Sequence, residues 1–146
     1  MWRVATILFL TLPALAQQVG NADKLAPLMS ALDSGQTHNS LPCTVEFIPP
    51  RLNLAFRFQD GYSARIPLDG YMGAERRSRI VFRVTRSGGQ PVYFVDTVDL
   101  PPRQDRGFDA LNTGLFFTGE GRYDVQWTMW DDLNRVCRKD WSFDAH

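Results

Sequence analysis

The sequence predicts an all-β protein, an antiparallel β-sandwich of about seven strands over residues 43–146. Apolar and polar residues alternate at a period of two along most of this region, as they do in half-buried strands. Glycine, proline, asparagine and aspartate interrupt the alternation at short intervals, which is typical of turns between strands. The length of 146 residues suits one domain, and the content of 44% hydrophobic and 22% charged residues suits a folded chain.

The first 16 residues have the pattern of a secretory signal peptide. Arg3 supplies a positive charge, residues 4–12 form a short apolar stretch, and Ala14-Leu15-Ala16 offers the small residues that signal peptidase accepts. The alternative is a buried N-terminal helix. We therefore expect residues 1–16 to be removed and the protein to be secreted, periplasmic or extracellular.

Residues 17–42 are predicted to form a linker or a short helix. Pro27 suits the first position of a helix that runs through Asp33. Such a helix places Leu28, Met29 and Leu32 in one apolar stripe, which needs a partner surface.

Alternation assigns the residues of each later strand to an inward or an outward row. The first strand is expected to end at Pro49-Pro50, the second to run through Arg51–Gln59, and a short strand to lie near 115–118. The other rows expected to face inward are Cys43, Val45 and Phe47; Leu52, Leu54, Phe56 and Phe58; Ala64, Ile66 and Leu68; Ile80, Phe82 and Val84; Val92, Phe94 and Val98; Tyr123, Val125, Trp127 and Met129; and Cys137, Trp141 and Phe143.

The rows also predict the turns, because residues opposite each other in a hairpin must point to the same face. This condition gives three-residue turns at 60–62, 87–89, 119–121 and 132–134. Such turns usually place a left-handed residue last, which suits Gly89, Gly121 and Asn134. Tyr62 does not suit that position, so we expect the first turn to be longer or to join different sheets.

Cys43 and Cys137 are the two cysteines of the chain, and we expect them to form a disulfide. An exported protein meets an oxidising compartment, in which cysteines normally pair. A metal site or a reactive thiol would be the alternative, but no Cys-x-x-Cys spacing supports either one.

The stretch Gly119–Val125 is similar to the tyrosine corner that opens the penultimate strand of immunoglobulin-like domains, including secreted domains of the polycystic-kidney-disease type. Gly121 and Tyr123 match the common Asp-x-Gly-x-Tyr-x-Cys pattern, whereas Gly119 replaces its Asp and Val125 replaces its Cys. The resemblance covers about 25 residues of the chain, and it implies an immunoglobulin-like fold without implying an activity. Because Val125 cannot form the usual disulfide between the sheets, a link from Cys43 to Cys137 would replace it.

No residue pattern predicts catalysis, a cofactor or a metal. His38 is the internal histidine, and no Gly-x-Ser-x-Gly motif surrounds any serine. Asp124, Asp131 and Asp132 are an alternative calcium site, but they lack EF-hand spacing and also suit a turn. We therefore expect a protein that is not an enzyme.

Arginines are concentrated in one part of the chain. Residues 51–86 contain eight arginines and three acidic residues, and Arg57 and Arg65 would be opposite each other if the turn were at 60–62. We predict that a basic face with Arg57, Arg65 and Arg83 contacts an acidic protein surface or a second copy of the chain. The alternative is that these charges are neutralised within the molecule.

Two aromatic residues are expected on outward rows, Tyr93 and Trp130. Exposed aromatic side chains are typical of contact sites and can also stack on sugar rings. The alternative is that the apolar stripe of residues 17–42 covers Trp130.

These observations favour an exported, non-enzymatic module that acts by protein–protein contact in a structural, adhesive or assembly role. A small carbohydrate-binding domain is the second interpretation. The 16 basic and 16 acidic residues argue against a nucleic-acid-binding protein, and no apolar run is long enough to span a membrane.

Overall fold

The structure is a computed structural model that describes residues 18–19, 29–30, 32–33, 40–71, 73, 75–102 and 107–146. Its strands are β1 (Gln18–Val19), β2 (Thr44–Leu52), β3 (Phe58–Pro67), β4 (Arg76–Arg86), β5 (Pro91–Leu100), β6 (Asp109–Thr118), β7 (Gly121–Asp131) and β8 (Val136–Ala145). A 3-10 turn, η1 (Leu68–Tyr71), follows β3. The predicted leader and His38 lie outside the described residues.

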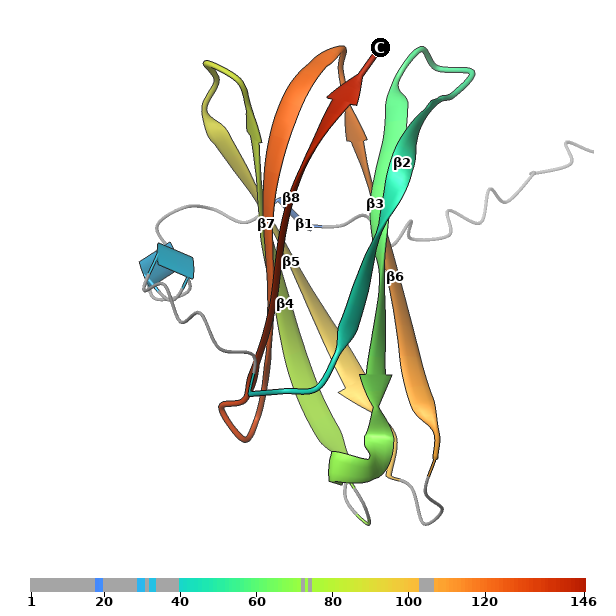
Figure 1. The fold of residues 1–146 in the computed structure, drawn as a ribbon, viewed down its shortest axis with the longest axis vertical. Helices are drawn as coiled ribbons and strands as arrows, with labels where there is room; N and C mark the ends of the chain where they lie inside the picture. The colour runs from blue at the N-terminus through green and yellow to red at the C-terminus, as the bar shows by residue number, and fades with distance from the viewer. Residues whose placement is uncertain are drawn as a thin grey trace, which may run out of the picture.

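Two antiparallel sheets pack face to face, which confirms the predicted all-β sandwich (Figure 1). The larger sheet has the order β1-β5-β4-β7-β8, and the smaller sheet has the order β2-β3-β6. This is the division of strands in an immunoglobulin constant-type domain, except that β5 pairs with β4 instead of joining the smaller sheet. In the described part of the chain, no helix is long and apolar enough to cross a membrane.

Two of the predicted hairpins have the expected register. Val84 lies opposite Val92 across the β4–β5 turn, and Trp130 lies opposite Val136 across the β7–β8 turn. Asn134 adopts the predicted left-handed conformation with a φ of 58°, whereas Gly88 rather than Gly89 does so in the other turn.

The predicted turn at 119–121 is a connection between the two sheets. β6 pairs with β3 in the smaller sheet, and β7 pairs with β4 and β8 in the larger one. The residue spacing that predicts a three-residue hairpin here therefore did not mean that β6 and β7 pair with each other. β6 is also much longer than the predicted strand at 115–118.

The second predicted strand, Arg51–Gln59, is wrong. β2 continues through Pro49-Pro50 to Leu52 with an irregularity between Ile48 and Arg51, and the chain then turns at residues 53–57. The expected turn at 60–62 lies inside β3, where Gly61 is packed so closely that an added Cβ would be 2.4 Å from the Gly114 carbonyl oxygen. That glycine therefore marks a close approach of strands.

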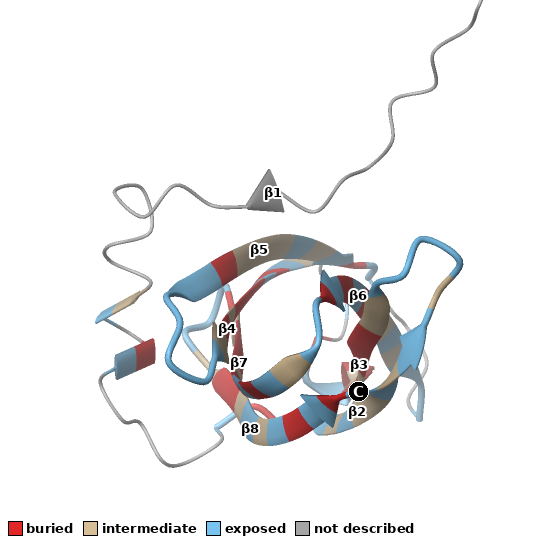
Figure 2. Ribbon diagram, turned by 90° about the horizontal axis from the view of Figure 1, so that it is seen from above, coloured by how far each residue is buried: buried red, intermediate tan, exposed pale blue. Residues whose placement is uncertain are grey.

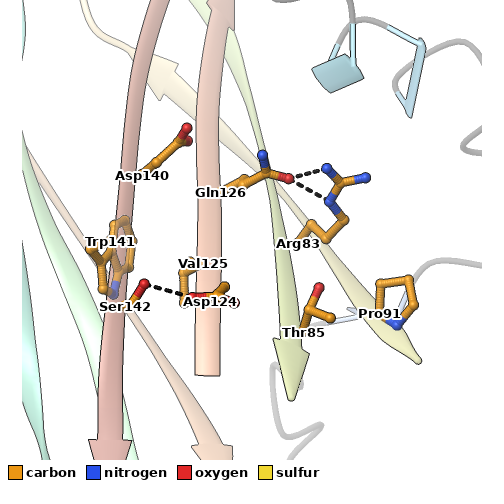
Figure 3. Close-up of a pocket in the computed structure, with 9 residues that line it drawn as sticks. All are labelled: Arg83, Thr85, Pro91, Asp124, Val125, Gln126, Asp140, Trp141 and Ser142. Carbon is orange, nitrogen blue, oxygen red and sulfur yellow. Dashed lines mark hydrogen bonds between the residues drawn. The ribbon is translucent and has the colours of Figure 1, made fainter. Parts of the chain in front are cut away.

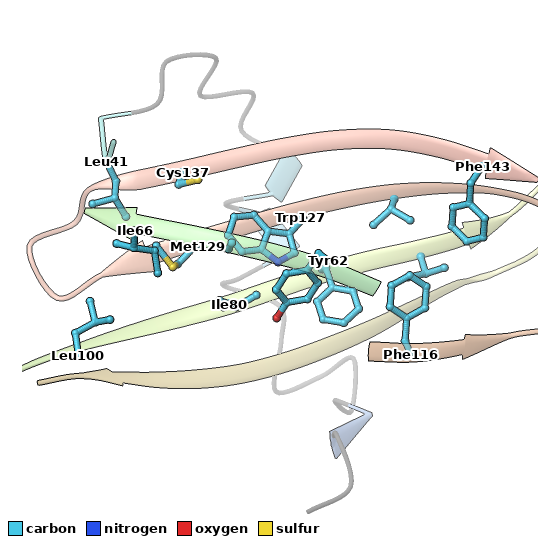
Figure 4. Close-up of a cluster of buried hydrophobic side chains, with 14 of the residues drawn as sticks. Leu41, Tyr62, Ile66, Ile80, Leu100, Phe116, Trp127, Met129, Cys137 and Phe143 are labelled. Carbon is cyan, nitrogen blue, oxygen red and sulfur yellow. The ribbon is translucent and has the colours of Figure 1, made fainter. Parts of the chain in front are cut away.

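Large aromatic side chains fill the space between the sheets (Figure 4). Trp127 from β7, Tyr62 from β3 and Phe82 from β4 are fully buried, and the Tyr62 ring lies 5.5 Å from that of Phe82 and 5.4 Å from that of Trp127. The residues predicted to face inward on β4 and β7 are all buried in this core, and both strands are largely buried in their middle parts (Figure 2). Val81, between two of these core residues, is buried instead in a separate cluster with Leu32 and Tyr93. The inward rows predicted for these two strands are therefore confirmed.

Two links hold the ends of the core together. Cys43 and Cys137 form the predicted disulfide, with their Cα atoms 6.2 Å apart, and this joins the start of β2 to β8. The Tyr123 hydroxyl donates a hydrogen bond of 3.1 Å to the Gly119 carbonyl, which is the contact expected of a tyrosine corner.

Candidate functional site

The structure separates the arginines that were predicted to form one binding face. Arg57 lies in the turn at 53–57, Arg65 lies on β3 of the smaller sheet, and Arg83 lies on β4 of the larger sheet. Arg57 and Arg65 are not opposite each other, because the hairpin turns at 53–57 instead of 60–62. Arg65 instead lies between Thr44 and Leu111.

Several of these arginines are neutralised within the molecule. The guanidinium groups of Arg65, Arg77 and Arg83 lie 3.4, 2.7 and 3.0 Å from carboxylates of Asp109, Asp99 and Asp33, and Arg76 forms a similar pair with Asp132. Exposed pairs of this kind contribute little to stability, but they remove free positive charge from the surface. The geometry therefore favours neutralisation over a continuous basic face.

Tyr93 and Trp130 lie on outward rows, as predicted, but they are not exposed together. Leu32 is buried against Val81 and Tyr93, and Met29 and Trp130 pack on the same cluster. Tyr93 retains 8% of its accessible surface. The structure therefore favours the alternative in which residues before the sandwich cover Trp130, and the same residues cover Tyr93.

A shallow depression of about 650 Å³ is lined by residues of β4, β5, β7 and β8 (Figure 3). Arg83 donates hydrogen bonds to Gln126 and pairs with Asp33, and Ser142 donates a hydrogen bond of 2.6 Å to Asp124. Four of the polar residues that line the depression are therefore already engaged in hydrogen bonds within the molecule.

Asp131, a candidate calcium ligand, is a structural residue. Its carboxylate accepts hydrogen bonds from the backbone N–H groups of Leu133 and Arg135, from Arg135 Nε at 2.7 Å and from the Tyr71 hydroxyl at 3.0 Å. Burial raises the pKa of Asp131, but the hydrogen bonds from Arg135 and Tyr71 outweigh burial and bring that pKa below its ordinary value. Burial, reinforced by Asp131, raises the pKa of Tyr71 to about 12. Within the described residues, no group of three or more His, Cys, Asp or Glu side chains is placed to hold a metal ion.

Most of the exposed large apolar side chains belong to the smaller sheet and its hairpin. The apolar tip, defined as Leu52, Leu54 and Phe56, lies at the end of the β2–β3 hairpin that projects at the upper right of Figure 1. Leu54 is fully exposed at 102%, and Phe56 is 86% exposed. The prediction that these residues face the core is therefore wrong, although their spacing of two is that of a half-buried strand.

The turn that carries the apolar tip is held by its own hydrogen bonds. The Asn53 side-chain oxygen accepts from the backbone N–H of Ala55 at 2.9 Å and of Arg57 at 3.1 Å. The Asn53 N–H donates to the Arg57 carbonyl, and the Phe56 N–H donates to the Asn53 carbonyl. Phe56 adopts a left-handed φ of 55°, which a bulky residue rarely does.

A second exposed apolar row runs along β6. Leu111, Leu115 and Phe117 point outward, and Leu111 is 67% exposed. No residue from 110 to 119 is charged, in a chain in which 22% of the residues are. That uncharged run was a signal in the sequence that could have identified this surface.

No protein-family model and no curated protein matches the chain. Among solved structures, it is similar to an X-ray structure described as Northeast Structural Genomics Consortium target SoR45, with 13% identity and a TM-score of 0.43. The alignment covers 73% of this chain and 88% of that chain.

Proposed function

We propose that this protein is an exported, non-enzymatic module that acts by protein–protein contact, and that the apolar tip is the centre of its contact surface. The observation that carries the proposal is the high exposure of Leu54 and Phe56 in a turn held by hydrogen bonds. Neither side chain is buried in the core. A preorganised pair of apolar anchors is what a partner pocket binds most strongly, because little conformational freedom is lost on binding.

The backbone at Phe56 supports a role in binding. A bulky residue in the left-handed region costs about 1–3 kcal/mol, and glycine would avoid that cost. Folding alone would therefore favour a different residue at this position. A phenylalanine kept there at that cost is consistent with a side chain that contacts something outside the molecule.

The charge around the apolar tip indicates what kind of partner fits. Arg51 and Arg57 flank it, both are exposed, and neither forms an ion pair with any residue that the structure describes. The partner we propose is a protein with an apolar pocket and acidic groups at its rim. This replaces the broader basic face that the sequence predicts.

Export is supported by two features. The Cys43–Cys137 disulfide is of the kind that persists in oxidising compartments, and residues 1–16 have the pattern of a signal peptide. The carbohydrate-binding interpretation loses its main support, because Tyr93 and Trp130 are packed under Leu32 and Met29.

Photo-crosslinking tests the proposal in the organism that makes the protein. A photoreactive phenylalanine analogue placed at Phe56 should crosslink to a discrete protein, whereas the same analogue at Leu133 should not. Leu133 is the matched control, because it is 45% exposed in the turn between β7 and β8, at the opposite end of the sandwich (Figure 1).

Two substitutions separate binding from folding. Leu54→Asp in the probe-bearing chain should lower the crosslinking yield at least tenfold, while Leu133→Asp should leave it unchanged. Phe56→Gly in the unlabelled chain should make that chain more stable to urea, because the strain of the left-handed backbone is relieved. The same variant should compete less well than the native chain with the probe-bearing chain for the crosslinked partner. Equal crosslinking from positions 56 and 133 would contradict the proposal.

A further inference from the structure

We infer that β6 is a pairing edge, and that two copies of this chain join through their β6 strands into one continuous six-stranded sheet. β6 is an outer strand of the smaller sheet, and its lower half lies at the right of that sheet in Figure 1. This surface differs from the apolar tip, so the inference does not depend on the proposed function.

The register of β6 shows which of its backbone groups point away from β3. Its register with β3 is continuous from Asp109 to Thr118. The Leu68 N–H donates to the Phe108 carbonyl at 2.8 Å, which places Phe108 in a hydrogen-bonded pair with the β3 side. Because hydrogen-bonded and non-hydrogen-bonded pairs alternate in an antiparallel ladder, the N–H and C=O groups of Leu111, Thr113 and Leu115 point away from β3, toward the open edge.

The other edges of the two sheets are protected in ways that β6 is not. β2 contains Pro49-Pro50 and an irregularity in its register, β8 carries charges at residues 138–140 and at Asp144, and β5 is partly covered by β1. Proline, charge, bulges and coverage are the usual means of keeping an edge from pairing. The uncharged, regular β6 has no proline, charge or bulge within residues 110–119, and no other strand of the described residues pairs with its outer edge.

The residue pattern of β6 favours a second copy as the occupant. Leu111, Thr113 and Leu115 face outward at intervals of two, so the row reads almost the same in both directions from Thr113. A two-fold axis near Thr113 sets the uncharged residues of one copy against those of the other, without opposing like charges. The same axis keeps outward faces together, so Leu111 and Leu115 of both copies gain apolar neighbours.

The molar mass of the purified, disulfide-bonded chain tests this inference. Sedimentation equilibrium should give a dimer whose dissociation constant changes little with added salt, because the pairing uses backbone hydrogen bonds and apolar contacts. Thr113→Pro should weaken the dimer at least a hundredfold. Since the Thr113 N–H points to the open edge, this proline removes no bond to β3, and it is tolerated in an edge strand.

Leu115→Lys should weaken the dimer as strongly, whereas the matched control Leu133→Lys and the tip variant Leu54→Asp should leave it unchanged. Hydrogen exchange distinguishes pairing of the β6 edges from a dimer that forms by packing of the sheet faces alone. The Leu115 amide should exchange at least tenfold more slowly in the dimer than in the Thr113→Pro variant. In the native protein, the Thr113 and Leu115 amides should both exchange at least tenfold more slowly in the dimer than after dilution to the monomer. A monomer at millimolar concentration, or a dimer that Thr113→Pro leaves intact, would overturn the inference.

Discussion

Asp131 shows how much one buried carboxylate does in this fold. It ends β7 and receives hydrogen bonds from Leu133, Arg135 and Tyr71, and the Arg135 guanidinium also lies 4.7 Å from the centre of the Tyr71 ring. These contacts connect the β7–β8 turn to η1, which directly follows β3 in the chain. The residue therefore joins segments from both sheets at one end of the sandwich.

Asp131→Ala should lower the free energy of unfolding by about 2–3 kcal/mol, because Arg135 and Tyr71 lose their buried partner while Arg135 keeps some contact with water. The effect should depend on pH. The folded pKa of Asp131 is depressed, so its contribution is complete above the unfolded pKa and is lost as the pH falls through the folded one.

Urea unfolding of the native protein and of Asp131→Asn provides the measurement at acidic and neutral pH. The difference between their free energies of unfolding is plotted against pH. Burial raises the pKa of Asp60, although a hydrogen bond from Thr118 lowers it in part, so Asp60 acts with the opposite sign. Taking the difference isolates Asp131. A difference that does not shrink in acid would contradict the assignment.

The pairing of β3 with β6 depends on a glycine beneath an aromatic ring. Gly114 lies opposite Tyr62, and a Cβ at residue 114 would be 2.4–2.6 Å from atoms of the Tyr62 ring and hydroxyl. The absence of a side chain lets the Tyr62 ring lie against the strand and reach Phe82 and Trp127 of the opposite sheet. The contacts of Tyr62 with the opposite sheet therefore depend on a residue without a side chain at position 114.

Gly114→Ala should destabilise the fold by about 2–3 kcal/mol, because Tyr62 is fully buried and has no space into which to move. The control is Gly119→Ala, where the nearest atom to an added Cβ is the Tyr123 hydroxyl oxygen at 3.9 Å, an ordinary contact. Urea denaturation midpoints of the two variants provide the test. If the two variants were equally stable, the close packing of Tyr62 against Gly114 would not explain why a glycine is needed at that position.

At the scale of the whole molecule, the disulfide joins two strands that are far apart in the chain. Cys43 and Cys137 are separated by 94 positions, and they lie where the smaller sheet meets the larger one at β2 and β8. A crosslink that closes so long a loop restricts the unfolded chain strongly. It also closes the side of the sandwich opposite to β5 and β6.

Replacing both cysteines by alanine should lower the free energy of unfolding by about 4–5 kcal/mol, on the chain-entropy estimate for a loop of this length. Reduction of the native protein should have the same effect, and reductant should leave the double variant unchanged. Unfolding in urea with and without reductant measures both. A native protein that is equally stable after complete reduction would show that the disulfide adds nothing to stability.

The order of the amino acids determined the two central strands of the larger sheet, β4 and β7. Period-two alternation correctly assigned Phe82 and Val84 of β4 and Val125 and Trp127 of β7 to the core, and the turn at Asn134 followed from local backbone preference. These properties are local. Each depends on residues a few positions apart, so a single sequence is enough to reveal them.

Tertiary structure alone decided which apolar residues became a surface. Leu54 and Phe56 alternate as a core strand does, but they lie in an exposed turn, whereas outward-facing Tyr93 is covered by Leu32 from far earlier in the chain. In the same way, β6 and β7 are adjacent in sequence yet join different sheets. Alternation states which residues share a face, but whether a second layer covers that face depends on distant segments, and the exposed tip and the open edge of β6 both follow from that difference.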